Sequence, residues 1–355
     1  MTPTHRIESS PLPDRYARGW HCLGLAEDYR DGKPHRLDVF GTRLVAFSGD
    51  DGNVRIVDAF CPHMGADLST GEVIGGTIQC PFHHWRWDGS GKCVEIPYCK
   101  RIPPKARVKV WQTCEENQLL FVYNDPEGNP PAPELKIPRI DACYSDQWTK
   151  WNIKYWLFNT NCRELIDNLA DEAHFGAVHR APNDFFANVF EGHRATQITV
   201  GTSATLTENA LRTYNSYFGP AVHFTHMIAD HEGQALESIL LLIHVPRDQN
   251  SFHQRFGVIV KKLPSWTDEQ NQQLADAYSQ AVFDAFAGDQ KIWDNKLRID
   301  NPLLCESDGP IYQLRQWYSQ FYMDVANVPI DVKERKIFIT VDRVKVRPEI
   351  HHVFE

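Results

Sequence analysis

Short apolar runs of strand length fill the first third of the chain, and turn-forming residues separate them. The segments Asp50-Asp-Gly-Asn53 and Asp88-Gly-Ser-Gly91 have the composition of tight turns. The apolar runs between such turns are Leu44-Val-Ala-Phe47, Val54-Arg-Ile-Val57, Gly76-Thr-Ile-Gln79 and Leu119-Leu-Phe-Val122. This pattern predicts a small all-β domain over residues 38–135, preceded by an N-terminal segment over residues 1–37.

The remaining residues, 136–355, mix two periodicities behind a proline-rich stretch that begins at Asn124. Residues 159–179 have the pattern of a helix, and residues 190–262 read as strands. A long helix is predicted over residues 267–295, with Ser265 or Thr267 as its N-cap and acidic residues near its start. The fold class is therefore α+β, with a cavity expected beneath the long helix.

Composition and charge narrow the class of protein. The 355 residues are enough for two domains, with 42% hydrophobic and 23% charged residues. The net charge of -9 and the lack of a basic run argue against nucleic acid as a partner. No apolar segment has the length of a membrane span, and the N-terminus has no secretory pattern. We expect a cytoplasmic protein.

Two loops each carry one cysteine and one histidine, as Cys61-Pro-His63 and Cys80-Pro-Phe-His83. One possibility is a structural zinc site, which usually takes its four ligands as paired cysteines or paired histidines. The mixed loops fit a Rieske [2Fe–2S] cluster better, because two thiolates then hold one iron and two imidazoles hold the other. Cys93 and Cys99, which flank a short turn, are interpreted as structural residues.

These loops resemble the signature of Rieske proteins, and they are most similar to those of the oxygenase class. High-potential Rieske proteins have an additional cysteine in each loop, where this chain has Ala66 and Phe82. His84 departs from the family, in which most members have a smaller residue, and we expect a surface or interface histidine there.

A second group of candidate ligands lies in Asn168-Leu-Ala-Asp171-Glu-Ala-His174-Phe-Gly-Ala-Val-His179. Two histidines and a carboxylate form the facial triad of non-haem iron(II) oxygenases. Residues five apart are about 140° apart around a straight helix, so a break or π-type turn at Gly176 is predicted. The alternative is that His174 and His179 are ordinary helix histidines.

The Asp-x2-His-x4-His pattern resembles the catalytic domain of Rieske non-haem iron oxygenases. That resemblance implies a helix-grip fold with a curved antiparallel sheet, a long C-terminal helix and assembly as a homotrimer. It also implies that an aspartate on the late helix is the third iron ligand. Asp284, Asp289 and Asp294 are candidates, and Asp289 in Asp289-Gln-Lys-Ile-Trp293 matches the family pattern.

By the same resemblance, Asp171 lies between the metal sites of neighbouring subunits and has a catalytic role. It is expected to hydrogen-bond a Rieske histidine of one subunit and His174 of the next. Such a carboxylate would fix the orientation of both imidazoles.

The likeness extends over most of the chain and is closest to one branch, the oxygenase component of 3-ketosteroid 9α-hydroxylases. Related sterol 7-desaturases are also similar. Gln197, Phe286 and Trp293 are implied as residues of the substrate pocket, although single aromatic residues more often pack a core. The implied substrate is a flat, apolar 3-ketosteroid.

The resemblance implies a monooxygenase that uses O2, a [2Fe–2S] cluster and Fe(2+). Electrons would come from NADH through a separate ferredoxin-type reductase, since no nucleotide-binding fingerprint is visible in the chain. Two alternatives remain open at this point. One is an oxygenase or desaturase acting on another sterol, a bile acid or an aromatic compound, and the other is an electron-transfer protein with a vestigial second site.

Overall fold

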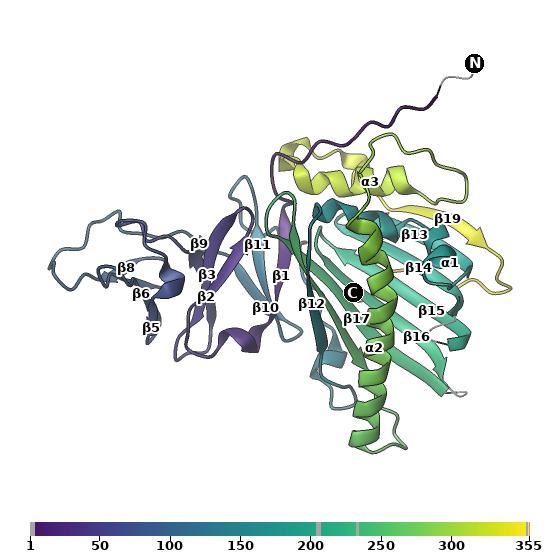
Figure 1. Ribbon diagram of the computed structural model, residues 1–355, viewed down its shortest axis with the longest axis horizontal. Coiled ribbons are helices and arrows are strands. Elements are labelled where there is room, and N and C mark those ends of the chain that lie inside the picture. The colour runs from purple at the N-terminus through teal and green to yellow at the C-terminus, as the bar shows by residue number, and fades with distance from the viewer. Residues whose placement is uncertain (1–3, 204–206, 232–233, 353, 355) are drawn as a thin grey trace.

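The computed structural model describes residues 4–203, 207–231, 234–352 and 354, which form four antiparallel sheets and three α-helices. Three small sheets lie at one end of the molecule and one large sheet lies at the other (Figure 1). The small sheets have the strand orders β1-β11-β10, β2-β3-β4-β9 and β5-β6-β7-β8. Their strands are β1 (Gly19–Leu25), β2 (His35–Val39), β3 (Thr42–Ser48), β4 (Val54–Asp58), β5 (Glu72–Ile74), β6 (Thr77–Gln79), β7 (Arg86–Asp88), β8 (Cys93–Glu95), β9 (Val110–Trp111), β10 (Thr113–Glu116) and β11 (Leu119–Asn124).

The large sheet has eight strands in the order β12-β18-β17-β16-β15-β14-β13-β19. Its strands are β12 (Asn152–Phe158), β13 (Asn183–Glu191), β14 (Arg194–Ser203), β15 (Thr207–Phe218), β16 (Val222–His231), β17 (Gln234–Pro246), β18 (Phe252–Val260) and β19 (Lys336–Asp342). The α-helices are α1 (Ala173–Ala177), α2 (Asp268–Trp293) and α3 (Ile311–Ser319). Within the described ranges the structure also has eight short 3-10 helices: η1 (Ala26–Tyr29), η2 (Leu68–Thr70), η3 (Asp141–Tyr144), η4 (Cys162–Glu164), η5 (Ile166–Leu169), η6 (Gln320–Tyr322), η7 (Val325–Asn327) and η8 (Ile330–Val332).

The long helix α2 crosses one face of the large sheet and contacts β12 and β18 (Figure 1). Its start is fixed by a capping box, in which the Thr267 side chain accepts a hydrogen bond from Gln270 N–H and the Gln270 side chain accepts one from Thr267 N–H. Apolar residues of α2, including Phe283 and Phe286, pack against buried residues of β16, β17 and β18. The α+β class and the long capped helix were therefore predicted correctly.

The predicted helix over residues 159–179 is confirmed only in part, because the segment is helical in three short pieces and not as one helix. The segment forms the 3-10 turns η4 and η5 and then the five-residue helix α1. Asn161 caps η4 by accepting a hydrogen bond from Arg163 N–H, and the chain turns again at Ala170. These turns direct successive side chains of the segment toward α2 and α3, which one straight helix could not do.

The small sheets include a strand from the predicted N-terminal segment. β1 pairs antiparallel with β11, so residues 19–25 belong to the same sheet as residues 119–124. The division of the chain at residues 37 and 135 stays a prediction.

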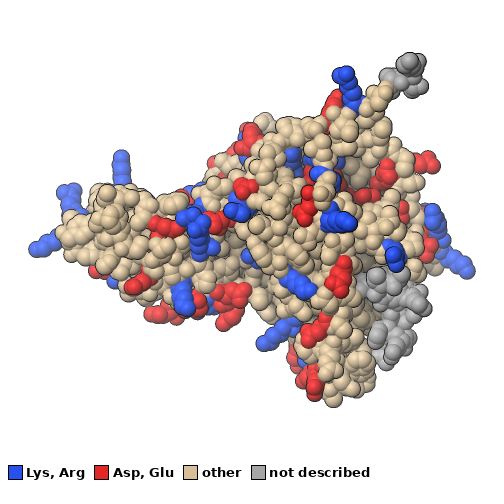
Figure 2. All heavy atoms as spheres, viewed as in Figure 1, with Lys and Arg blue, Asp and Glu red and all other residues tan. Residues whose placement is uncertain are grey.

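Charged side chains of both signs are interspersed over the face of the molecule in Figure 2. This agrees with the modest net charge of -9 and gives no extended basic surface on that face. No helix within the described ranges is long and apolar enough to cross a membrane.

Candidate metal centres and substrate cavity

The two cysteine–histidine loops have the same backbone turn. Gly65 N–H donates to the Cys61 carbonyl at 2.8 Å, and His84 N–H donates to the Cys80 carbonyl at 3.0 Å. Gly65 and His84 both have positive φ angles, of 77° and 58°. His84 therefore occupies the position that glycine occupies in the first loop, and its side chain is exposed.

The side chains of these loops converge at the end of the molecule formed by β5 to β8. Cys61 and Cys80 are 1% and 2% exposed, and the rings of His63 and His83 are 4.7 Å apart. Burial raises the pKa of the Cys61 thiol to about 11, and the adjacent Cys80 thiol adds to this shift. His83 Nδ1 is buried without a hydrogen-bond partner among the described residues. The loops thus offer two thiols and an imidazole nitrogen as candidate metal ligands.

The spacing of these atoms favours two metal ions over one. The four ligands of a tetrahedral zinc, at 2.0–2.3 Å from the metal, lie within about 4 Å of one another. Here the Cys61 and Cys80 thiols are neighbours of each other and the rings of His63 and His83 are 4.7 Å apart, so the candidate ligands fall into a cysteine pair and a histidine pair. A [2Fe–2S] cluster is wider, because each iron has its own pair of ligands. The residues therefore fit the cluster better than a structural zinc ion.

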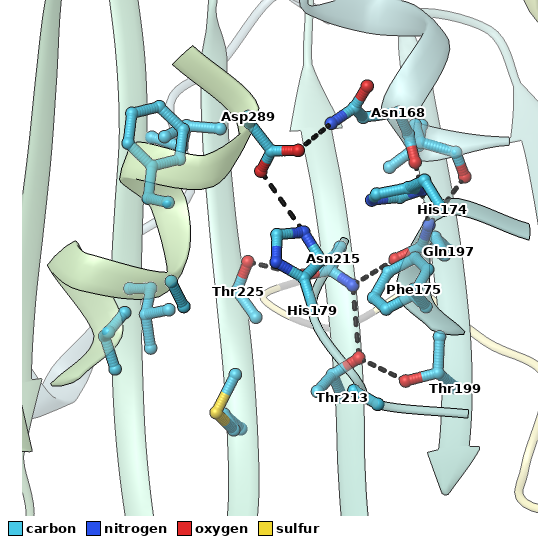
Figure 3. A pocket seen from close by; sticks show the side chains of 18 of the residues that line it. Asn168, His174, Phe175, His179, Gln197, Thr199, Thr213, Asn215, Thr225 and Asp289 are labelled. Atoms are coloured by element: carbon cyan, nitrogen blue, oxygen red, sulfur yellow. Dashed lines mark hydrogen bonds and ion pairs between the residues drawn. The ribbon is translucent and has the colours of Figure 1, made fainter. Parts of the chain in front are cut away.

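A second group of ligands lies beneath α2. His174, His179 and Asp289 each offer an atom, and these atoms all lie within 4.8 Å of one another. His179 Nε2 is 3.2 Å from Asp289 Oδ2, and Asp289 is buried (Figure 3). Burial lowers the pKa of His174 although the carboxylates of Asp289 and Asp171 oppose the shift, so the ring is neutral as a metal ligand must be. Two imidazoles and one carboxylate fit an iron(II) ion with open coordination positions.

The predicted break between the two histidines is present, but it lies after Gly176. α1 ends at Ala177, and Ala181 N–H donates to the Phe175 carbonyl at 2.9 Å across a tight turn. Arg180 in this turn has a positive φ of 53°. Gly176 has an ordinary helical position with space for a side chain, so the turn that brings His179 back does not depend on it.

Asp171 lies beside His174, with a geometry that differs in detail from the expected one. The backbone carbonyl of Asp171 contacts His174 Nδ1 at 2.5 Å, and its carboxylate is 4.0 Å from the same atom. The carboxylate instead accepts a hydrogen bond from His174 N–H at 3.3 Å. With Nδ1 bonded to the carbonyl, Nε2 is the ring atom left for a metal. The Asp171 side chain is 38% exposed, so it is open to a neighbouring molecule.

A polar network joins the triad to the sheet (Figure 3). Asn168 Nδ2 donates to Asp289 Oδ1 at 3.4 Å, and Gln197 Nε2 donates to the Asn168 and Leu169 carbonyls. Asn215 Nδ2 donates to Gln197 Oε1. The side-chain oxygen of Asn215, Oδ1, accepts a hydrogen bond from the Thr225 hydroxyl at 2.6 Å. Asp289, the third predicted iron ligand, is thus connected by hydrogen bonds through Asn168 to side chains on β14, β15 and β16.

The triad lies on the wall of a cavity of about 200 Å³ between α2 and the sheet. The three predicted pocket residues, Gln197, Phe286 and Trp293, all line it. Sequence reasoning did not identify several other lining residues, which include Asn168, Thr213, Asn215, His223 and Thr225. The sequence pattern that could have identified them is a polar residue at every second position of a strand, as at Thr213 and Asn215, because alternate residues of a strand face the same side of the sheet.

The remaining candidates lie outside these sites. Asp284 and Asp294 are exposed, and the Asp284 carboxylate accepts a hydrogen bond from Gln280 on the same helix. All nine cysteines are free, with Cys93 buried and Cys99 exposed.

Two family models match the chain. A model described as the Rieske [2Fe-2S] domain matches residues 19–112, and one described as the 3-Ketosteroid 9alpha-hydroxylase C-terminal domain matches residues 122–322. The oxygenase component of a 3-ketosteroid-9-alpha-monooxygenase from Rhodococcus rhodochrous is 46% identical over 93% of this chain and 87% of its own length. The one from Mycobacterium tuberculosis is 45% identical over 93% of this chain and 88% of its own. A cholesterol 7-desaturase from Ciona intestinalis is 27% identical over 88% of this chain and 70% of its own.

Solved structures share the fold at lower identity. Dicamba monooxygenase bound to dicamba has a TM-score of 0.70 at 21% identity, covering 87% of this chain and 98% of its own. NdmB of Pseudomonas putida has a TM-score of 0.73 at 16% identity, covering 92% and 99%. The cofactors of this class of oxygenase are a [2Fe–2S] cluster and a mononuclear iron, and the chain has a group of candidate ligands for each. The chain belongs to the family of 3-ketosteroid 9α-hydroxylase oxygenase components.

Proposed function

We propose that this protein is the terminal oxygenase that hydroxylates a 3-ketosteroid at the 9α position with O2. The observation that carries the proposal is the triad of His174, His179 and Asp289 on the wall of a cavity lined mainly by apolar residues. The family match and the 46% identity to 3-ketosteroid monooxygenase components support the substrate class.

The cavity has the shape and chemistry for a long, rigid, apolar substrate. On β15, lining residues extend from Leu211 to Tyr217, a span of about 20 Å along an extended strand. Phe286 and Trp293 of α2 close the other side with their rings 5.5 Å apart. Apolar walls of this kind exclude water from a reacting C–H bond and hold a flat substrate by contact area.

In this proposal, two residues beside the triad orient the candidate iron ligands. The Asp171 carbonyl orients the His174 ring, and Asn168 orients the Asp289 carboxylate. Cys61, Cys80, His63 and His83 would hold the cluster, while His174, His179 and Asp289 would hold the iron. The bound groups supply stored electrons and reductive activation of O2.

The positions of the two sites support assembly as a homotrimer. β5 to β8 and α1 lie at opposite ends of the molecule in Figure 1, so electron transfer within one chain would cross its whole length. A neighbouring copy would bring its own cluster loops to the exposed Asp171, which would then bond a cluster histidine of that copy. In this proposal an NADH-dependent ferredoxin-type reductase supplies the electrons, and the assembly works in the cytoplasm.

A single-turnover experiment tests the proposed function. The iron-loaded protein is reduced chemically, so that no reductase is needed, and is given 18O2 with separate 3-ketosteroids, sterols and aromatic compounds. We expect labelled oxygen at carbon 9 of a 3-ketosteroid. Labelled product from a sterol or aromatic compound alone, or a desaturated product, would overturn the substrate class and the reaction.

The triad argues against the electron-carrier alternative. Asp289 is buried against His179, and an arrangement of this kind is not expected at a site that has lost its function. The desaturase alternative has the weaker sequence support, at 27% identity against 46%.

A further inference from the structure

One histidine of the cavity wall has no hydrogen-bond partner for either ring nitrogen in the part of the chain that the structure describes. His223 is 9% exposed and lines the cavity, and both Nδ1 and Nε2 are buried without a hydrogen bond among the described residues. Of the described residues that line the cavity, only His223 has a buried side-chain nitrogen or oxygen in this condition. Leaving such a group unpaired is unfavourable, so a partner is expected from whatever fills the cavity.

The register of the sheet places His223 at one end of the cavity. It is the second residue of β16, directly opposite Tyr217 and next to the turn that joins β15 to β16. Thr225 lies two residues further on, about 7 Å along the strand, and belongs to the hydrogen-bonded network that leads to Asp289. His223 therefore lies at a fixed distance from the triad, measured along the strands that line the cavity.

The ring is held in a defined orientation and charge state. Tyr217 stacks on it with ring centroids 4.4 Å apart and an interplanar angle of 14°. Burial lowers the pKa of His223 to about 3, so the ring is neutral near pH 7. A neutral imidazole has one N–H donor and one acceptor nitrogen, so it can pair with a carbonyl or a hydroxyl oxygen.

We propose that His223 is a specificity-determining residue that hydrogen-bonds an oxygen at one end of the steroid and thereby sets which carbon faces the triad. This inference rests on the proposed function, since it takes the cavity to be the steroid site. Three other polar residues of the cavity, Gln197, Asn215 and Thr225, already bond to one another and are less available for this task.

Binding measurements on the iron-loaded, oxidised protein test the proposal apart from turnover. Calorimetry compares a 3,17-diketosteroid with its 17-deoxo and its 3-deoxo analogue. We expect the wild type to bind one of the two analogues about tenfold more weakly than the diketone, and that analogue identifies the oxygen that His223 contacts. In His223→Phe, which keeps an aromatic ring to stack on Tyr217 but has no hydrogen-bonding nitrogen, the tenfold preference is lost. In His223→Gln, part of it returns.

His226→Phe is the matched control. His226 lies on the same strand, does not line the cavity and pairs with Glu237, so its loss should leave the preference unchanged. The regiochemistry of the product should broaden in His223→Phe alone. Equal weakening of all three ligands in His223→Phe, or no preference in the wild type, would overturn the role of His223. If the wild type binds none of the three, the steroid assignment fails and the inference fails with it.

Discussion

His84 shows how one residue can meet a backbone requirement that its neighbour in the fold meets with glycine. The positive φ at Gly65 and His84 lets each loop turn back so that its cysteine and histidine face the same space. Polar residues such as histidine tolerate this left-handed region better than β-branched ones do. The departure of His84 from its family is thus compatible with the cluster loop.

Substitution of His84 tests the strain at this position. We expect His84→Val to lower the free energy of unfolding of the cluster loops by about 1–3 kcal/mol, because a β-branched side chain is disfavoured at positive φ. The measurement is loss of cluster absorbance in urea. His84→Gly is the control and should be as stable as the wild type or more stable, whereas equal stability of all three proteins would contradict the role given to the backbone.

Asp171 is predicted to couple the sites without holding either metal. Asp171→Asn should keep the full iron content and lower the yield of hydroxylated product per electron by about 10–100-fold. The reason is that a neutral amide is a weaker acceptor than the carboxylate, both for the His174 backbone N–H and for a cluster histidine of a neighbouring copy. Iron analysis and single-turnover product yield are the measurements. Glu172→Gln, at the next residue, is the control, and normal coupled turnover in Asp171→Asn would refute the assignment.

At the scale of elements, the segment between β12 and α1 is fixed by ion pairs that bury charge. Asp167 on η5 receives two hydrogen bonds from Arg315 on α3, at 3.0 and 2.7 Å, and also contacts Arg298. Burial alone would raise the pKa of Asp167, but the bond from Arg315 and the charges of the nearby cations outweigh it and lower the pKa. This arrangement holds η5, and with it Asn168, against the triad.

Removal of Arg315 should therefore destabilise the catalytic half of the chain. We expect Arg315→Met to cost about 3 kcal/mol near pH 7, because it leaves a buried carboxylate with weaker partners. Since the folded pKa of Asp167 is depressed, its ion-pair stabilisation is present above the unfolded value of about 3.9 and is lost as pH falls through the folded pKa. The difference between variant and wild type in chemical unfolding should thus shrink below about pH 4.

Arg315→Lys, which keeps the charge but not the two-point contact, should lie between the two proteins. A difference that is independent of pH would mean that the ion pair is not its source.

These ion pairs also explain which elements the sequence could predict. The cap of α2 is local, since Thr267 and Gln270 are three residues apart, and so the helix start was predicted from pattern alone. Residues 159–179 are rich in polar side chains that pair with Arg298, Arg315 and Asp289, all distant in sequence. The helical pattern carries no information on these distant contacts, and so it predicted one helix where the chain forms three short helical pieces. The spacing of Cys61, His63, Cys80 and His83 predicts one set of ligands directly, whereas the choice of Asp289 over Asp284 required a resemblance.

At the scale of the whole molecule, the sheet of β5 to β8, next to the two cysteine–histidine loops, and α1, which carries His174, lie toward opposite ends (Figure 1). Around the cluster loops, Phe60, Met64, Phe82 and Tyr98 are between 49% and 64% exposed, which is unusual for large apolar residues near one another. Such a surface suits contact with a reductase or with another copy. Transfer between chains follows if the copies pack the cluster end of one against α1 of the next.

Mixed assemblies test transfer between chains. Cys61→Ser should remove the cluster and Asp289→Ala the mononuclear iron, so each variant alone should form no product. When the two variants are co-expressed with different tags and co-purified, we expect partial activity, since an intact cluster of one chain then serves an intact triad of another. Co-purified assemblies that contain both variants and remain inactive would contradict transfer between chains.

The central claim is that one chain holds both a [2Fe–2S] cluster and a separate iron. Analysis of iron and acid-labile sulfide in the fully loaded protein tests it most directly. We predict about three irons and two sulfides per chain, falling to about two irons and two sulfides in Asp289→Ala. Two irons and two sulfides in the wild type would mean an electron carrier without a second site, and zinc without sulfide would contradict the account altogether.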